Sequence, residues 1–137
     1  VIFYITSKGD FYVRNSDDYM AKMISLAGGK YIMDGKVGVG KTGTTKMEAE
    51  SFFDLAKDAD EIIYVWSTGG KPSTLNDLLA KNSVLADMKA VKEGNVWCTT
   101  PDFFQISNTI GNIINDMNSV FSADASADKF TYLYKLK

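Results

Sequence analysis

A continuous apolar run, EIIYVW at residues 61–66, is the feature that most constrains the fold of this chain. Polar segments bound it on both sides, DAD before it and STGG after it. An unbroken apolar run of strand length is typical of a strand that is buried on both faces of a parallel sheet. Strand-like and helix-like segments alternate on either side of this run. The sequence therefore predicts a layered α/β fold.

The N-terminal third carries clear start and stop signals. β-Branched and aromatic residues at 1–6 and 11–14 flank the turn SKGD and predict a hairpin. Ser16 is placed to cap a helix whose apolar stripe ends at the glycine pair 28–29. A short extended piece is expected at 30–33.

Strand-like and helix-like segments also alternate in the rest of the chain. Thr45 and Glu48 have the spacing of a capping box, so a helix is expected to begin near Lys46. Apolar positions between 106 and 121 follow helical spacing and predict the most amphipathic helix of the chain. Further helices are expected at 75–82 and 84–93, further strands at 95–99 and 129–137, and a polar linker at 122–128.

Composition limits the classes of function. The chain has 137 residues, the size of one domain, and 15 Lys plus Arg against 17 Asp plus Glu give a net charge of -2. Without a basic block, a nucleic-acid partner is not expected. Cys98 is the single cysteine and histidine is absent, which excludes an internal disulfide and a thiolate-rich zinc site. No apolar run reaches 18 residues, and the first residues, which read as a strand, lack signal-peptide features, so we expect a piece of a longer protein.

The stretch GKVGVGKT at 35–42 matches the string of a phosphate-binding loop. In such a loop the helix begins at the Gly-Lys-Thr itself, whereas the capping box places the next helix later in the chain. The segment before it is short and half polar, and the apolar run at 61–66 is followed by Ser67 instead of a magnesium-binding Asp. A surface loop is therefore favoured, and a nucleotide-binding protein remains the alternative.

Four segments, taken in order, resemble the C-terminal lobe of substrate-binding proteins of ABC importers. The similarity is to the class that serves iron-siderophores, haem and cobalamin, within the TroA-like superfamily. Its elements are a helix ending in LAGG, a Glu that opens the next helix before an acidic turn and a strand, and the pattern L..MKAVKEGNVW. The segments are YVRNSDDYMAKMISLAGGKYI, GTTKMEAESFFDLAKDADEIIYVW, LNDLLAKNSVLADMKAVKEGNVWCT and FFQISNTIGNIINDM.

The resemblance implies a fold and a partner. Residues 1–137 would form a single three-layer α/β/α lobe with a mostly parallel central sheet. An N-terminal lobe and a long linking helix would be absent from this chain, and ligand would lie in the cleft between the lobes. A surface Glu on each lobe of this class pairs with arginines of the ABC permease, and the matching position is Glu50, with Glu48 as the near alternative. The parent protein would be an extracellular or periplasmic lipoprotein that meets the membrane only through a lipid anchor.

Ligand contacts are expected in loops at the carboxyl ends of strands. Arg14 suits the paired oxygens of a ferric chelate, and aromatic rings suit a macrocycle. Trp66 and Trp97 are equally compatible with a core position, and Arg14 with an ion pair to Asp17 or Asp18. The candidates are Tyr12, Arg14, Trp66, Ser67, Thr68, Phe103, Phe104 and Gln105, with Trp97 and Thr99 nearby.

Catalysis and direct metal ligation are not expected. Without histidine, neither a Ser-His nor a Cys-His pair is possible, and a bare-metal receptor lacks its usual ligand. We expect no cofactor, and a metal chelate, haem or corrin-like molecule as the ligand. The alternatives are the nucleotide-binding loop and a non-catalytic interaction domain, which would be favoured if Arg14, Trp66 and Phe103 lay on different faces.

Overall fold

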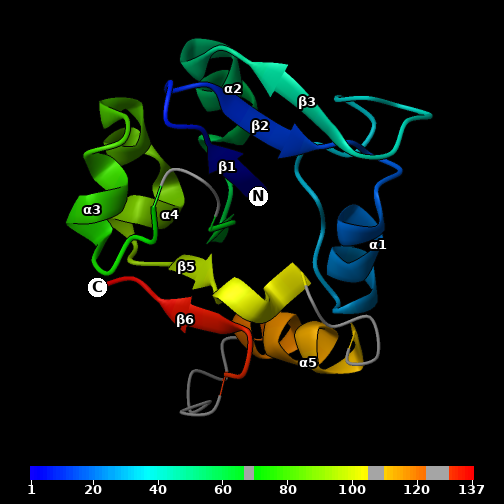
Figure 1. Ribbon diagram of the computed structural model, residues 1–137. Coiled ribbons are helices and arrows are strands. Elements are labelled where there is room, and N and C mark those ends of the chain that lie inside the picture. Colours follow the sequence, from blue (N-terminus) through cyan, green and yellow to red (C-terminus); the bar gives the residue numbers. More distant parts are fainter. Residues whose placement is uncertain (67–69, 105–109, 123–129) are drawn as a thin grey trace.

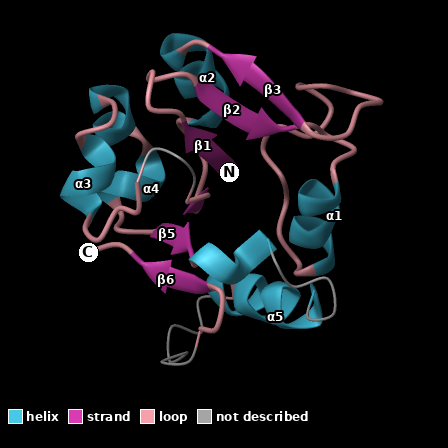
Figure 2. Cartoon of the chain, viewed as in Figure 1, coloured by secondary structure: helices cyan, strands magenta, loops and turns pink. Residues whose placement is uncertain are grey.

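A computed structural model describes residues 1–66, 70–104, 110–122 and 130–137. Within these residues the chain forms one six-stranded sheet in the order β3-β2-β1-β4-β5-β6, with helices packed around it (Figures 1 and 2). The strands are β1 (Ile2–Ile5), β2 (Phe11–Arg14), β3 (Thr44–Met47), β4 (Ile62–Tyr64), β5 (Val96–Thr99) and β6 (Leu133–Lys135). The helices are α1 (Tyr19–Leu26), α2 (Ala49–Ala56), α3 (Leu75–Leu79), α4 (Lys89–Lys92) and α5 (Ile110–Phe121), with 3-10 turns η1 (Ser83–Asp87) and η2 (Pro101–Phe104).

The centre of the sheet is parallel and its sides are antiparallel. β1, β4 and β5 are parallel neighbours, as the buried run at 61–66 predicted. β2 forms the expected hairpin with β1, and β3 and β6 add to the two sides in antiparallel pairing. Because β3 reverses direction twice relative to β1, four strands run one way and two the other. The predicted three-layer α/β fold with a mostly parallel sheet is confirmed.

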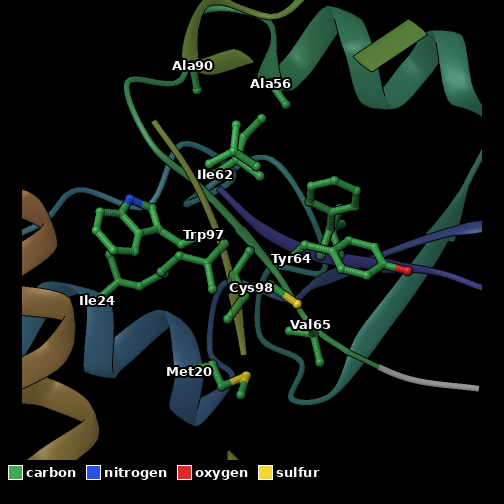
Figure 3. Packing of buried hydrophobic residues seen from close by; sticks show 14 of the residues in the cluster. Met20, Ile24, Ala56, Ile62, Tyr64, Val65, Ala90, Trp97 and Cys98 are labelled. Carbon is green, nitrogen blue, oxygen red and sulfur yellow. The ribbon is translucent and has the colours of Figure 1, made fainter. Parts of the chain in front are cut away.

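Helices cover both faces of the sheet. Phe52 of α2 packs on one face, 4.5 Å from the ring centroid of Phe3 and 4.7 Å from that of Phe11. Figure 3 shows Ala56 of α2 on this side of the strands and Met20 of α1 on the other. Because side chains alternate between the two faces of the sheet, each strand contributes to two apolar layers. All three residues of β4 are buried for this reason.

Two expected elements have another structure, and the helix expected at 84–93 is divided at the extended Met88 into η1 and α4. Residues 30–33 form turns and not a strand. The Thr45–Glu48 capping box is also wrong: residues 44–47 form β3, α2 begins at Ala49, and Glu48 makes no capping hydrogen bond. Thr45 Oγ1 instead donates to Asn15 Oδ1 at 2.6 Å. Pairing with the whole length of β2 therefore outweighs the local helix signal.

The N-cap of α1 lies two residues later than expected. Asp18, and not Ser16, accepts a hydrogen bond from the backbone N–H of Met20 at 3.0 Å. Ser16 Oγ donates to the carbonyl of Val37 at 2.9 Å and accepts from Gly35 N–H at 3.1 Å. Asp18 therefore caps the helix, whereas Ser16 makes hydrogen bonds to the backbone of the glycine-rich loop.

Candidate functional site

The parallel strands define two edges of the sheet. Thr6, Trp66 and Thr100 lie just beyond the ends of β1, β4 and β5, and we term this the carboxyl edge. Val1 and Glu61 precede β1 and β4 and lie at the opposite, amino edge. Ligands of open α/β sheets bind beyond the carboxyl ends of the strands, so the carboxyl edge is the candidate site.

Three of the predicted residues, Trp66, Phe103 and Phe104, lie at the carboxyl edge. Trp66 is half-buried, and its backbone N–H donates to Thr99 Oγ1 at 2.9 Å. Phe103 in η2 is buried in the core cluster, and Phe104 ends the same turn. Ser67, Thr68 and Gln105 lie outside the described residues. The structure therefore brings Trp66 and Phe103 to one edge, and their contact with ligand stays a prediction.

Arg14 lies at the opposite edge, contrary to the expected grouping. It ends β2, which runs antiparallel to β1, and it is paired in register with Thr44 at the start of β3. Its guanidinium is 3.7 Å from the Asp18 carboxylate and 5.9 Å from the ring centroid of Tyr19. The structure therefore supports the ion-pair alternative for Arg14. Arg14 is also separated from Trp66 and Phe103, the two residues with which it was expected to share a face.

The remaining aromatic candidates are parts of the sheet. Tyr12 lies in the middle of β2, half-buried, with its ring stacked on that of Tyr4 at a centroid distance of 5.0 Å. Trp97 is buried, and its indole N–H donates to Glu61 Oε2 at 3.0 Å, at the amino edge. Burial of the Glu61 carboxyl raises its pKa. Trp97 therefore has a structural role.

The carboxyl edge contains polar groups that the sequence did not single out. Among the described residues, Trp66 Nε1 and Thr100 Oγ1 are buried and have no hydrogen-bond partner. The ammonium of Lys71 lies 4.9 Å from the ring centroid of Tyr134, and that of Lys81 lies 6.0 Å from the ring centroid of Tyr64. Trp66 and Thr100 are neighbours only through the register of β4 and β5, so no local motif marks the pair.

Burial also controls the ionisable groups beneath this edge. Tyr64 and Cys98 are opposite each other in β4 and β5. Burial disfavours their charged forms and raises the pKa of Tyr64 to about 12 and that of Cys98 to about 11. The pKa of Tyr134, the partner of Cys98 in β6, is raised for the same reason. Cys98 is therefore a protonated core residue and not a nucleophile.

These shifts predict a loss of stability in alkali. Unfolding restores ordinary pKa values of about 8.5 for Cys and about 10 for Tyr, so the unfolded chain releases protons that the folded chain keeps. Cys98 and Tyr64 should leave the stability unchanged below about pH 8 and lower it as the pH rises towards 11 and 12, by up to about 1.4 kcal/mol per pH unit for each of these two groups. Urea unfolding between pH 7 and pH 11 measures this. In Cys98→Val the fall should begin near pH 10, and an unchanged onset in that variant would contradict the assignment.

Both candidate permease contacts lie at the carboxyl edge. Met47, the last residue of β3, is paired with Phe11 beside the end of β1, so α2 starts there. Glu48 and Glu50 are exposed at this start. Glu48 makes no side-chain capping bond, which removes the capping role expected for it. Either carboxylate is accessible to a partner that approaches this edge of the sheet.

The glycine-rich stretch does not form a phosphate-binding loop. Residues 34–43 make a series of turns that lead into β3, and no helix follows Lys41. The loop's own N–H groups are partly used by carboxylates: Gly40 N–H donates to Asp17 at 2.7 Å and Gly43 N–H to Asp18 at 2.8 Å. Acidic partners at these donors exclude the anion cradle that the motif requires, and the nucleotide reading is wrong.

Gly38 should be essential for the packing of this loop. It has a φ of +54°, and a Cβ there would lie 2.7 Å from Asn15 Cβ and closer still to the Asn15 amide. That amide is buried and donates to the Thr42 carbonyl at 2.8 Å. Gly38→Ala should therefore destabilise the protein by about 2–4 kcal/mol in urea unfolding. Gly40→Ala is the control, because its φ is also positive but nothing lies within 4 Å. Equal losses would contradict the clash with Asn15.

A hollow of about 730 Å³ lies at the amino edge, away from the candidate site. Its lining includes the apolar Ile24, Ile63 and Phe121 and charged residues of both signs. Val1 lines it too. Because it lies at the ends where the parallel strands begin, it does not correspond to the position of ligand sites in open α/β sheets.

Two general features of the described part of the chain bear on function. It contains no group of three or more His, Cys, Asp or Glu side chains that could hold a metal ion. None of its helices is long and apolar enough to cross a membrane.

The chain is similar in sequence to lipoproteins of unknown function. An uncharacterized lipoprotein of Methanocaldococcus jannaschii is 30% identical over 125 residues, which cover 90% of this chain and 28% of the relative. A second uncharacterized lipoprotein of this organism is 28% identical over 131 residues, 91% of this chain and 32% of the relative. The chain thus spans less than a third of the length of these relatives. No protein-family model matches the chain.

Solved structures that match the chain include periplasmic binding proteins. A periplasmic heme binding protein from Pseudomonas aeruginosa matches with a TM-score of 0.75 at 13% identity, over 99% of this chain and 47% of that protein. A TroA-like periplasmic binding protein, FepB from Veillonella parvula, matches with a TM-score of 0.65 at 12% identity, over 99% and 48%. A siderophore periplasmic binding protein of Thermobifida fusca matches with a TM-score of 0.60 at 20% identity, over 89% and 44%. The chain therefore has the fold of one lobe of a TroA-like periplasmic binding protein.

Proposed function

We propose that the chain is the C-terminal lobe of the solute-binding component of an ABC importer. It would capture an iron-siderophore, haem or cobalamin-type ligand outside the cell and deliver it to the permease. The observation that carries the proposal is the fold: proteins that bind haem or siderophores match nearly all of this lobe and use about twice its length. Binding, and not catalysis, is the function that this fold supports.

The geometry of the carboxyl edge agrees with the proposal. Trp66 and Thr100 lie at the same edge as Glu48 and Glu50, so ligand and permease would meet the same side of the lobe. A second lobe would close over this edge and supply the other wall of the cleft, which is how binding proteins bury most of a ligand's surface. We propose Glu50, with Glu48 as the alternative, as the permease contact.

The two sequence relatives support a location outside the cell, at the membrane surface. Both are lipoproteins, so we propose that the full-length protein is held at the outer side of the membrane by a lipid anchor. In that place a receptor can take its ligand from the surroundings and remain close to its permease. A nucleotide-binding function finds no support, because the glycine-rich stretch leads into a strand.

The test is direct binding by the full-length protein. Mass spectrometry and absorption spectra of the purified protein should reveal a co-purifying iron chelate or pigment. Isothermal titration with a ferric tris-catecholate, a ferric trihydroxamate, haem and cobalamin should give one-to-one binding of at least one of them, with a Kd of about 1 µM or below. Selective binding of an amino acid or a sugar, with none of these four, would refute the proposal.

A further inference from the structure

The hollow at the amino edge has walls that the fold holds in place. Asn118 of α5 donates through Nδ2 to the carbonyl of Ala27, the C-cap of α1, at 3.0 Å. Gly29 allows this close approach of the two helix ends, since a Cβ there would lie 2.7 Å from the Phe121 ring. Protein interiors leave few voids larger than a water molecule, so a hollow of about 730 Å³ with such walls is no ordinary packing defect.

The lining of the hollow suits a polypeptide better than a strongly charged ligand. It exposes apolar surface, because Ile32 and Phe121 are only half-buried. Carboxylates and ammonium groups both occur in it, so it does not present the single sign of charge that attracts a strongly charged small molecule. These charged residues are Asp34, Asp58, Asp60, Glu61, Lys30 and Lys36.

Val1 lines the hollow as a strand residue. Its nitrogen donates to the Glu61 carbonyl at 2.6 Å, and its carbonyl accepts from Ile63 N–H at 2.8 Å. These are the two hydrogen bonds of a parallel strand neighbour, and a peptide N–H can make the first of them. Burial lowers the pKa of the Val1 α-ammonium to about 5, although the carboxylates of Glu61 and Asp60 oppose this shift. The position therefore suits the neutral N–H of a peptide bond.

The relatives are long enough to supply the chain to which such a peptide bond leads. The matched region is 28% and 32% of the two lipoproteins, and 47% and 48% of two solved binding proteins. In the proposed C-terminal lobe a segment precedes Val1. A peptide bond is only about 1.33 Å long, so the residue bonded to the Val1 nitrogen must itself lie at the hollow.

We propose that the segment that precedes Val1 in the full-length protein packs an apolar face into this hollow, against Ile32 and Phe121. This inference rests on the proposed function, in which the chain is one lobe of a longer protein. It gives the hollow a covalently attached occupant and leaves the carboxyl edge to the ligand. Contact with both the sheet and the ends of α1 and α5 would fix the direction in which the chain enters the lobe, and with it the position of the preceding part of the protein.

Thiol labelling of the full-length protein tests this contact. Lys30→Cys and Lys36→Cys place probes at two parts of the lining, and both positions are exposed in the lobe. Lys22→Cys in α1 and Lys41→Cys in the glycine-rich loop are the matched controls, since both are exposed and lie outside the lining. A sulfonated maleimide should react about tenfold or more slowly at the probes than at the controls, because the segment limits access to them. Peptide mass spectrometry distinguishes each introduced thiol from Cys98.

Three results would overturn the inference. Equal rates at probes and controls in the native protein would show that nothing covers the hollow. Protection that rises with protein concentration would assign the hollow to a second copy of the protein, and protection that is lost on exhaustive dialysis would assign it to a bound small molecule. Titration with the two ferric chelates, haem and cobalamin separates this inference from the proposed function. Binding with unprotected probes overturns the inference alone, and protection without any binding overturns the proposed function alone.

Discussion

Phe52→Ala should lower the free energy of unfolding by about 3–5 kcal/mol, a large part of the total stability of a domain this size. Phe52 is fully buried, and its ring lies 4.5 Å from that of Phe3 and 4.7 Å from that of Phe11, measured between centroids. It thereby joins α2 to β1 and β2, the two strands of the hairpin. Truncation would leave a cavity that these rigid aromatic neighbours cannot fill, because they are held by the sheet.

Urea unfolding followed by circular dichroism measures this loss. Phe53→Ala is the matched control, since the same residue type on the same helix is only half-buried and should lose clearly less. A loss below about 1 kcal/mol in Phe52→Ala would show that α2 is not fastened to the hairpin through this ring.

The parts of the fold that the sequence predicted are those that local composition decides. Within the run at 61–66, residues 62–65 offer no polar position to expose, so only a strand buried on both faces satisfies them, and β4 is such a strand. The turn SKGD is bracketed by two strand-like runs, and Gly9 takes up the positive φ of +85° that the hairpin requires. The glycine pair at 28–29 ends α1 as expected.

The parts that failed are decided by partners far away in the chain. TTKM at 44–47 is half polar and carries a helix-start signal, yet it is a strand because β2 offers an edge of equal length. The four residues 44–47 contain no pattern that reveals the free edge of β2. In the same way 30–33 has strand-like composition but finds no strand to pair with, and it forms turns that carry the chain into the glycine-rich loop.

The residues of the candidate site also divide into those that local sequence predicts and those that only distant strand pairing places. Trp66 was predicted because it directly follows a recognisable strand. Thr100 was missed, since only the register of β4 and β5 brings its strand end beside that of Trp66. Arg14 was misplaced for a simple geometric reason: the second strand of a hairpin ends at the opposite edge of the sheet from the first. A predicted hairpin therefore already separates the ends of its strands, and this rule would have excluded Arg14 from the carboxyl edge.

Glu50→Arg should abolish most transport without changing ligand affinity. Glu50 is exposed at the start of α2, at the carboxyl edge, where the proposed permease contact lies. Reversal of its charge places a cation against the arginines that the family resemblance implies on the permease. Like charges brought together in an interface oppose association, so uptake by proteoliposomes that contain the full-length protein and its permease should fall about tenfold or more. The Kd measured by titration should stay within about twofold, because the carboxylate does not touch the ligand in this proposal.

Two further variants make this result specific. Glu93→Arg reverses an equally exposed glutamate after α4, remote from the carboxyl edge, and should transport normally. Glu48→Arg decides between the two candidates, since a larger loss there than in Glu50→Arg would assign the contact to Glu48. A contact of this kind steers an encounter between exposed charges, so uptake by the unmodified protein should also weaken with rising ionic strength. Full transport by both Glu50→Arg and Glu48→Arg would remove the start of α2 from the permease interface, and the lobe would then dock through another surface.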